Sequence, residues 1–287
     1  MEESRRTRKD SRLSIREHFT MIKLITPEEM PHMRTVGRMM ANLLNACCER
    51  VRPGVTTGEI DAFARAYIST LGDGTAKSGC LGYNGFPGAL CISVNEEVIH
   101  GIPGARVLQR GDIVSLDVCG SYHGYYGDNT RTVIVGGAEA VTADVRRLLR
   151  VTRQALETAV QAIRPGVHLG DISHLVEKTI ADGGCTVVRE YTGHGVGRHL
   201  HEDPPVPNYG KPGRGPILHE GMTLAIEPMV NLGKAAVRVL SDGWTVVSRD
   251  GLPTAHFEYT VAVLKEGAEI LTPWYEVDPW SADWMKS

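Results

Sequence analysis

Two aspartates stand out in the segment GDIVSLDVCGSYHGYYGDNTRTVIV, whose two ends have the composition of strands. A hairpin centred on Tyr122–His123 places Asp117 directly opposite Asp128, and opposed residues have Cβ atoms about 4.5–5.5 Å apart. Two ionised carboxylates at that distance repel unless one is protonated or a cation lies between them. A solvated surface hairpin with splayed carboxylates is the alternative. The apolar residues around Asp117 favour the cation site.

Three more metal-binding side chains follow downstream. His194 lies in GHGVG, Glu227 ends the apolar run MTLAIE, and Glu258 begins EYTVAVL. A carboxylate at the end of a buried strand is unfavourable unless it is paired or bound to a cation. Each residue alone could be a hydrogen-bonded core group. Together, one imidazole and four carboxylates suit divalent Mn, Fe(II) or Co, and five ligands favour two ions that share bridging carboxylates.

Two further histidines can serve a substrate near such ions, since imidazole donates and accepts protons near neutral pH. They are His100, in VIHGIP, and His201, in HLHEDPP. We expect no role for the remaining histidines, which lie in tail, turn or helix-flank contexts: His18, His32, His123, His168, His174, His199, His219 and His256.

The elements that position these residues include two pairs of helices. The first helix begins at Thr26–Pro27, or two or three residues later because of Pro31, and runs to about Arg52. The second begins near Thr57. The segment VRPGVTTGEI recurs as IRPGVHLGDI 112 residues later, each copy between two helices, which indicates an internal duplication. Two such helix–helix–strand units would pack as one pseudo-symmetric α+β domain. Strands are expected at Leu90–Val94, Ile113–Cys119, Thr130–Val135, Thr223–Ile226 and Glu258–Leu264.

Composition excludes several classes of protein. The 287 residues are 42% hydrophobic and 23% charged, which is typical of a globular chain and not of a disordered one. The net charge of −3 argues against a dedicated nucleic-acid site, and no apolar run approaches the ~20 residues of a membrane span. The six cysteines form no CxxC pair, and the N-terminus has no secretory apolar stretch. We therefore expect free thiols and a cytoplasmic protein.

The two ends of the chain differ from its middle. Residues 1–20 carry six basic and four acidic residues and read as a disordered tail, with a transit peptide as a weaker alternative. We expect the biological chain to start at Met21, with 1–20 an over-long gene prediction or a dispensable extension. Residues 21–272 then form one catalytic domain of two related halves. Residues 273–287 form an aromatic tail that folds back on it, or else makes an oligomer contact.

The chain resembles the type I methionine aminopeptidases from about residue 22 to 272. The matching stretches are CLGYNGFPGALCISVNEEVIHGIP, GDIVSLDVCGSYHGYYGDNTRT, REYTGHGVGRHLHEDPPV, GMTLAIEPMV, DGWTV and FEYTV. The resemblance implies the pita-bread fold, a pseudo-two-fold α+β domain with an antiparallel sheet flanked by two helix pairs. It also implies two divalent ions, Co, Mn or Fe(II), held by five residues: Asp117, Asp128, His194, Glu227 and Glu258. Of these, Asp128 and Glu258 would bridge the ions.

The resemblance further implies the reaction, which is hydrolysis of the N-terminal Met–Xaa bond by a water that the ions activate, when the second residue is small. Glu227 would move the proton, His201 would stabilise the oxyanion, and His100 would contact the scissile nitrogen. The methionine pocket would be lined by Cys80, Tyr83, Phe86, Cys91, Leu200 and Trp244. Leu200 stands where some family members carry an aromatic residue.

Two other functions share these residues. Prolidases and proline-specific aminopeptidases resemble this fold but usually carry a large N-terminal domain, whereas here the first duplicated helix starts near residue 27. Non-catalytic members have lost ligands, and this chain keeps all five. Only 25 residues separate His201 from Glu227, which favours type I over type II. We expect a monomer that acts on nascent polypeptide N-termini, with a transient ribosome contact as a further expectation.

Overall fold

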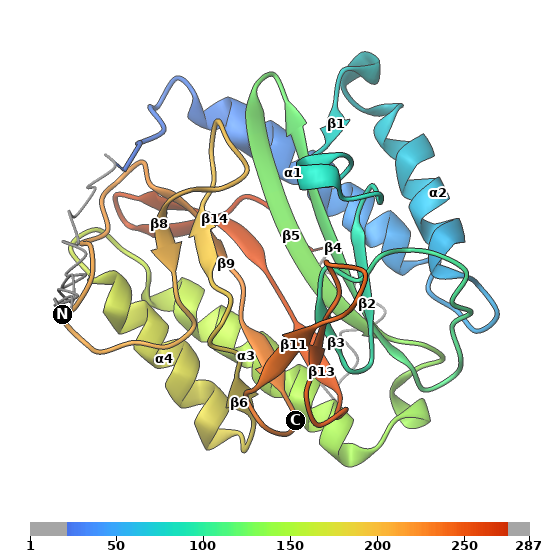
Figure 1. Ribbon diagram of the computed structural model, residues 1–287. Coiled ribbons are helices and arrows are strands. Elements are labelled where there is room, and N and C mark those ends of the chain that lie inside the picture. Colours follow the sequence, from blue (N-terminus) through green and yellow to red (C-terminus); the bar gives the residue numbers. More distant parts are fainter. Residues whose placement is uncertain (1–21, 275–287) are drawn as a thin grey trace, which may run out of the picture.

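The computed structural model describes residues 22–274, in which helices and strands alternate along the chain (Figure 1). The expected tail 1–20, the start at Met21 and the aromatic residues after Trp274 lie outside the described residues. The helices are α1 (Met30–Cys48), α2 (Thr57–Ile68), α3 (Ala143–Ala162) and α4 (Leu169–Asp182), with short 3₁₀ helices at Leu71–Gly74, Tyr83–Gly85 and Ala138–Ala140. The strands are β1 (Lys77–Ser78), β2 (Cys91–Val94), β3 (Glu97–Ile99), β4 (Ile113–Tyr122), β5 (Tyr125–Ile134), β6 (Thr186–Val187), β7 (Gly193–Gly195), β8 (Glu202–Val206), β9 (Thr223–Ile226), β10 (Met229–Asn231), β11 (Val237–Val239), β12 (Val246–Ser248), β13 (Thr254–His256), β14 (Tyr259–Leu264) and β15 (Gly267–Ile270).

The strands pair antiparallel throughout, so the expected α+β architecture is confirmed. Hydrogen bonding groups them into sheets ordered β1-β4-β2 with β5 on β4, β15-β14-β9-β7-β8, β13-β10-β6 and β11-β12-β3. Helix α1 packs on β4 and β5, whereas α3 packs on β9, β10, β13 and β15. In Figure 1 the α1–α2 pair lies at the upper right and the α3–α4 pair at the lower left, with strands between them. None of the described helices is both long and apolar enough to cross a membrane.

The two halves of the chain repeat the same local contacts. In the first copy of the RPGV segment, the Gly54 amide donates to the carbonyl of Leu108 at 2.9 Å. In the second copy, the Gly166 amide donates to the carbonyl of Leu218, also at 2.9 Å. Each segment then leads directly into a helix, α2 or α4. The matching hydrogen bonds support the internal duplication.

Helix α1 starts later than the capping pattern suggests. It begins at Met30, with Pro31 in its first turn, because a proline lacks the N–H that an interior helical position must donate. The Glu29 carboxylate accepts from the Thr26 amide at 2.9 Å. The expected pairing of Thr26 with Glu29 therefore forms, but in the turn that precedes the helix. The helix ends at Cys48, short of the expected Arg52.

The turn of the β4–β5 hairpin is displaced by one position from the expected centre. Tyr122 pairs with Tyr125, so the two turn residues are His123 and Gly124. Both have positive φ, 51° and 81°, which is the backbone of a type I′ turn. Glycine adopts this conformation without steric cost, and Gly124 therefore selects the second turn position.

This displacement shifts the pairing of the two aspartates. Asp117 lies opposite Thr130, and Asp128 lies opposite Cys119, so the predicted direct opposition of the aspartates is wrong. The shift is two residues, and side chains alternate faces with a period of two. The aspartates thus remain on one face of the hairpin as diagonal neighbours.

Trp274, the last described residue, is 9% exposed and packs into the main core. Its ring lies 4.2 Å from that of Tyr259 and 5.7 Å from that of Phe257, measured between centroids. The guanidinium groups of Arg131 and Arg153 lie 5.7 Å from its centroid. The core therefore extends past residue 272 at this end.

Candidate metal centre and adjoining pocket

The five candidate ligands come from strands that meet in space. Asp117 and Asp128 belong to the β4–β5 hairpin, and His194 is the central residue of β7. Glu227 directly follows β9, and Glu258 directly precedes β14. Strand β9 pairs with both β7 and β14, so His194, Glu227 and Glu258 lie on neighbouring strands.

Hydrogen bonds join this sheet to the β4–β5 hairpin. The Asp128 amide donates to the Thr260 hydroxyl at 3.0 Å, and that hydroxyl donates to the Asp128 carbonyl at 2.8 Å. The Thr130 hydroxyl donates to Glu258 Oε2 at 2.8 Å. Strands β5 and β14 are thereby held edge to edge, which brings Asp128 beside Glu258.

The ligating atoms are close enough to share a cation. One ligand atom each from Asp128, His194 and Glu258 lie within 4.8 Å of one another. His194 Nε2 lies 3.8 Å from Asp128 Oδ2 and 3.5 Å from Glu227 Oε1. Asp117 joins the group through the cavity that it lines together with Asp128. The structure thus brings all five predicted ligands to one place.

The protonation of His194 suits a metal ligand. Its Nδ1 lies 2.9 Å from the carbonyl oxygen of Gly195, which can only accept, so the hydrogen belongs on Nδ1. Burial lowers the pKa of His194 to about 4, with a smaller contribution from the charge of His201. The ring is therefore neutral at pH 7, and the lone pair of Nε2 faces the carboxylates.

The four carboxylates are costly to ionise together without a cation. Burial raises the pKa of Asp117 to about 7 and that of Glu227 to about 8. Burial, reinforced by the charges of the neighbouring carboxylates, raises the pKa values of Asp128 and Glu258 well above their ordinary range. A bound divalent cation reverses this repulsion and favours the ionised forms.

Two carboxylate oxygens provide a direct test of whether cations fit. Asp128 Oδ1 and Glu258 Oε1 are buried and have no hydrogen-bond partner among residues 22–274. Buried polar atoms are nearly always satisfied, and an unsatisfied carboxylate oxygen is especially unfavourable. Both oxygens belong to residues predicted to bridge two ions. The donor set of four carboxylates and one imidazole therefore fits hard divalent ions.

A cavity of about 250 Å³ adjoins these ligands. It contains every residue predicted for the substrate, and Asp117 and Asp128 form part of its wall. Its predicted lining residues are Cys80, Tyr83, Phe86, Cys91, His100, Leu200, His201 and Trp244. Phe86 and Trp244 meet edge to face with ring centroids 5.1 Å apart. The result is a small apolar and sulfur-lined pocket next to the candidate metal centre.

The two predicted substrate histidines lie on the walls of this pocket. His201 Nδ1 is 2.8 Å from the hydroxyl of Tyr83, and its ring centroid is 4.3 Å from that of His194. Burial lowers the pKa of His100 to about 4 and also lowers that of His201. Both rings are therefore neutral at pH 7. When Nδ1 of His201 accepts from Tyr83, its hydrogen lies on Nε2 and can be donated.

Several residues near the site were missed from the sequence. His256 was expected to have no role, but it is 2% exposed and its Nε2 lies 3.4 Å from Glu227 Oε2. Burial lowers its pKa to about 4. Gly79, Asn84 and Cys119 also line the cavity. His256 lies two residues before Glu258 and Cys119 two after Asp117, and this spacing was the available signal because extended chains repeat every two residues.

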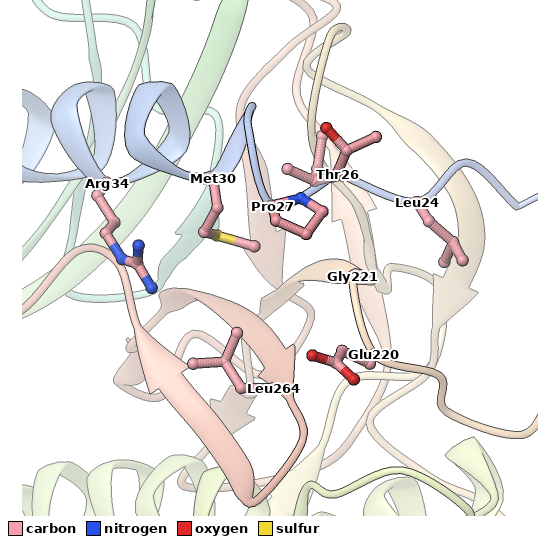
Figure 2. A pocket seen from close by; sticks show the side chains of 9 residues that line it. Leu24, Thr26, Pro27, Met30, Arg34, Glu220, Gly221 and Leu264 are labelled. Atoms are coloured by element: carbon pink, nitrogen blue, oxygen red, sulfur yellow. The ribbon is translucent and has the colours of Figure 1, made fainter.

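A larger cavity, of about 580 Å³, lies elsewhere, between the segment leading into α1 and the end of β14 (Figure 2). Leu24, Pro27, Met30 and Leu264 give it an apolar lining. Its Arg34 is engaged by Glu269 at 2.7 Å. None of the candidate ligands or predicted substrate residues lines this cavity. The chemistry of its lining residues, rather than its size, makes the smaller cavity the candidate functional site.

Comparison with known proteins agrees with this geometry. Residues 31–265 match the metallopeptidase family M24. Over 252 residues the chain is 46% identical to methionine aminopeptidase 1 of Bacillus subtilis, covering 88% of this chain and 99% of that protein. Over the same length it is 43% identical to the methionine aminopeptidase of Escherichia coli K12, covering 94% of that protein.

Solved structures give the same result. The methionine aminopeptidase of Thermotoga maritima superposes with a TM-score of 0.84 at 45% identity, covering 88% of this chain and 99% of the other. The prolidase of Pyrococcus furiosus superposes with a TM-score of 0.68 at 23% identity, and the match covers 66% of that protein. The second likeness shows only that the fold is shared.

Proposed function

The chain belongs to the metallopeptidase family M24, alongside the methionine aminopeptidases, and from this premise we propose that it uses two divalent ions to remove the N-terminal methionine from polypeptides whose second residue is small. Its membership makes it a metal-dependent aminopeptidase, a hydrolase with the pita-bread fold. The number of ions and the preference for a small second residue are our proposal. One observation carries it: five candidate ligands converge beside a pocket suited to one side chain.

We assign the ions to Asp117, Asp128, His194, Glu227 and Glu258. Asp128 and Glu258 each have a buried oxygen without a protein partner among the described residues, which supports a bridging role. Divalent ions held there would polarise a carbonyl group and lower the pKa of water toward neutrality. Cobalt, manganese and iron(II) all suit this donor set, so the choice among them is left to metal analysis.

The chain's own side chains would handle the protons. Glu227 would be ionised beside the bound ions, so its carboxylate could accept a proton from the attacking water and pass it to the leaving amine. His201, with its hydrogen on Nε2, would donate to the substrate carbonyl oxygen as that oxygen gains negative charge. His100 would contact the nitrogen of the scissile bond.

The pocket supports methionine as the residue removed. A volume of about 250 Å³ accommodates one unbranched side chain, and sulfur packs favourably against aromatic rings. Phe86 and Trp244 supply such rings, and Cys80, Cys91 and Leu200 complete an apolar lining. As in the methionine aminopeptidases that the chain resembles, the ligands and histidines would crowd the next residue of the substrate. This resemblance is our reason for proposing a small second residue.

Peptide hydrolysis tests the proposal. The metal-loaded enzyme should release methionine from Met-Ala-Ser and should be much slower on Met-Leu-Ser. Cleavage of Xaa-Pro peptides in place of Met-Ala-Ser would assign the chain to prolidase chemistry. Inactivity on every peptide in each of the divalent metals would favour a binding protein. We also propose that the substrates are nascent chains in the cytoplasm, which ribosome co-sedimentation of the tagged protein would test.

A further inference from the structure

Two thiols touch inside the substrate pocket. Cys80 and Cys119 both line the cavity, and their sulfur atoms are 3.2 Å apart. Both are free cysteines. Cys119 lines the cavity but has none of the metal-ligand, proton-transfer or methionine-binding roles proposed above. We propose that Cys80 and Cys119 form an oxidation site, where a hydroperoxide converts the two thiols into a disulfide within the pocket.

The backbone around the pair permits the bond. A disulfide has an S–S length of about 2.0 Å, so the sulfurs need to approach by only about 1.2 Å. Gly79, which precedes Cys80, donates its amide to the Cys119 carbonyl at 2.9 Å. A Cβ at Gly79 would lie 2.7 Å from the Cys119 sulfur. Glycine at this position therefore leaves the space that Cys119 occupies beside Cys80.

The pocket gives a small oxidant access to these sulfurs. Cys80 and Cys119 are 7% and 4% exposed, and the surface that remains faces a cavity of about 250 Å³, much larger than a hydrogen peroxide molecule. Cys47, Cys48 and Cys185 do not line this cavity. Oxidation should therefore select the pocket thiols over the cysteines elsewhere.

A third thiol, Cys91, raises the alternative of a soft-metal site. Such a site needs three or more ligand atoms that can reach one ion. Within the described part of the chain, the group formed by Asp128, His194 and Glu258 is the one that gathers three such atoms within 4.8 Å, and the thiols are not in it. The geometry thus favours chemistry between two sulfurs.

The oxidation balances without any further reagent. The Cys80 sulfur, its proton lost, attacks one oxygen of hydrogen peroxide and breaks the O–O bond, which gives a sulfenic acid and, with that proton, water. The Cys119 sulfur then attacks the sulfenic sulfur. The S–O bond breaks, hydroxide leaves, and it takes the Cys119 proton to become a second water. Two thiols are oxidised by two electrons, and the peroxide is reduced.

The new bond would act on the proposed function through the metal ligands. Cys119 lies opposite Asp128 in the hairpin and two residues after Asp117. Displacing a reacting group by about 1 Å costs about 10²-fold in rate. This step rests on the proposed peptidase activity, and we expect kcat/KM on Met-Ala-Ser to fall by about tenfold to a hundredfold, reversibly.

The test treats the full-length, manganese-loaded protein with hydrogen peroxide, blocks remaining thiols in denaturant, and maps peptides by mass spectrometry. A Cys80–Cys119 linked peptide, lighter than the two thiol peptides by two hydrogen atoms, is the expected product. Dithiothreitol should reverse it and restore activity, with metal content unchanged throughout. No disulfide, a Cys80–Cys91 pair or only sulfinic acid would overturn the assignment.

Two cysteine variants separate the Cys80–Cys119 pair from the cysteines outside the cavity. Cys119→Ser should abolish the linked peptide and the peroxide-dependent loss of activity, each compared with its own untreated sample. Cys185→Ser, a cysteine outside the cavity, should respond as the unaltered chain does. A linked peptide without any loss of activity would overturn the inhibitory effect. Because the mapping needs no turnover, it decides the oxidation site even if the peptidase proposal fails.

Discussion

Removing the metal ions should give the protein an unusual dependence of stability on pH. Burial raises the pKa of Glu227 from 4.5 to about 8, so the metal-free folded state binds this proton more tightly than the unfolded chain does. Stability contributed by such a group is present at low pH and is lost as pH rises through the folded pKa. Between about pH 6.5 and 8 that is a loss of about 2 kcal/mol, since one pH unit corresponds to about 1.4 kcal/mol.

The neighbouring groups set the shape of the curve. Asp128 and Glu258 also have raised pKa values, so they add to the loss above pH 6.5. The histidines act oppositely at lower pH. Burial lowers the pKa values of His194 and His256 from 6.5 to about 4, so stability falls as pH drops from 6.5 toward 4. Below pH 6.5 the carboxylates and the histidines oppose each other, so the net fall in stability of the metal-free protein should be clearest above about pH 6.5.

Urea unfolding followed by circular dichroism, in chelator and at a series of pH values, measures this curve. Glu227→Gln should reduce the fall above pH 6.5, whereas Asp182→Asn, an exposed residue paired with Lys178, should keep it. Bound ions need ionised ligands, so the stability gained from manganese should instead grow with pH. Metal-free stability that stays level or rises between pH 6.5 and 8 would refute the buried carboxylate cluster.

Three substitutions test other parts of the account. Asp128→Asn should abolish activity and lower bound metal below two ions per chain, because a bridging carboxylate serves both ions; full occupancy with normal turnover would contradict the assignment. His201→Ala should keep its metal and lower kcat by about 10²–10³, and a rise in KM alone would make His201 a simple binding residue. Trp274→Ala should destabilise the fold by about 3–5 kcal/mol in urea unfolding, because it empties a buried site between Tyr259 and Arg131; an unchanged midpoint would place that ring outside the cooperative core.

Much of the site could be predicted because its chemistry conflicts with its surroundings. Glu227 and Glu258 stand at the ends of apolar strands, where an unpaired carboxylate is unfavourable, so sequence alone indicates a cation. The helix that follows each RPGV segment was predictable for a different reason. The segment occurs twice, and a repeat of sequence implies a repeat of structure.

Other features depend on details that residue types specify only weakly. The hairpin register follows from which two residues adopt positive φ. Gly124 favours the second turn position, but His123 has no strong preference for the first. Cys119 lay at the end of an expected strand, two residues after Asp117, so side-chain alternation already placed it on the face of the site. His256 belongs to β13, a strand that the sequence did not predict. The contact of Cys80 with Cys119 depends on pairing between β1 and β4, which sequence spacing does not give.

The most direct test measures metal content and methionine release on the same sample. Metal-free protein is titrated with manganese under anaerobic conditions. At each step the manganese bound per chain is measured by elemental mass spectrometry, and Met-Ala-Ser hydrolysis is followed on the same sample. We expect activity to reach its maximum as occupancy approaches two ions per chain, and Asp128→Asn to reach neither. Full activity with a single ion bound, or two ions bound without release of methionine, would contradict it.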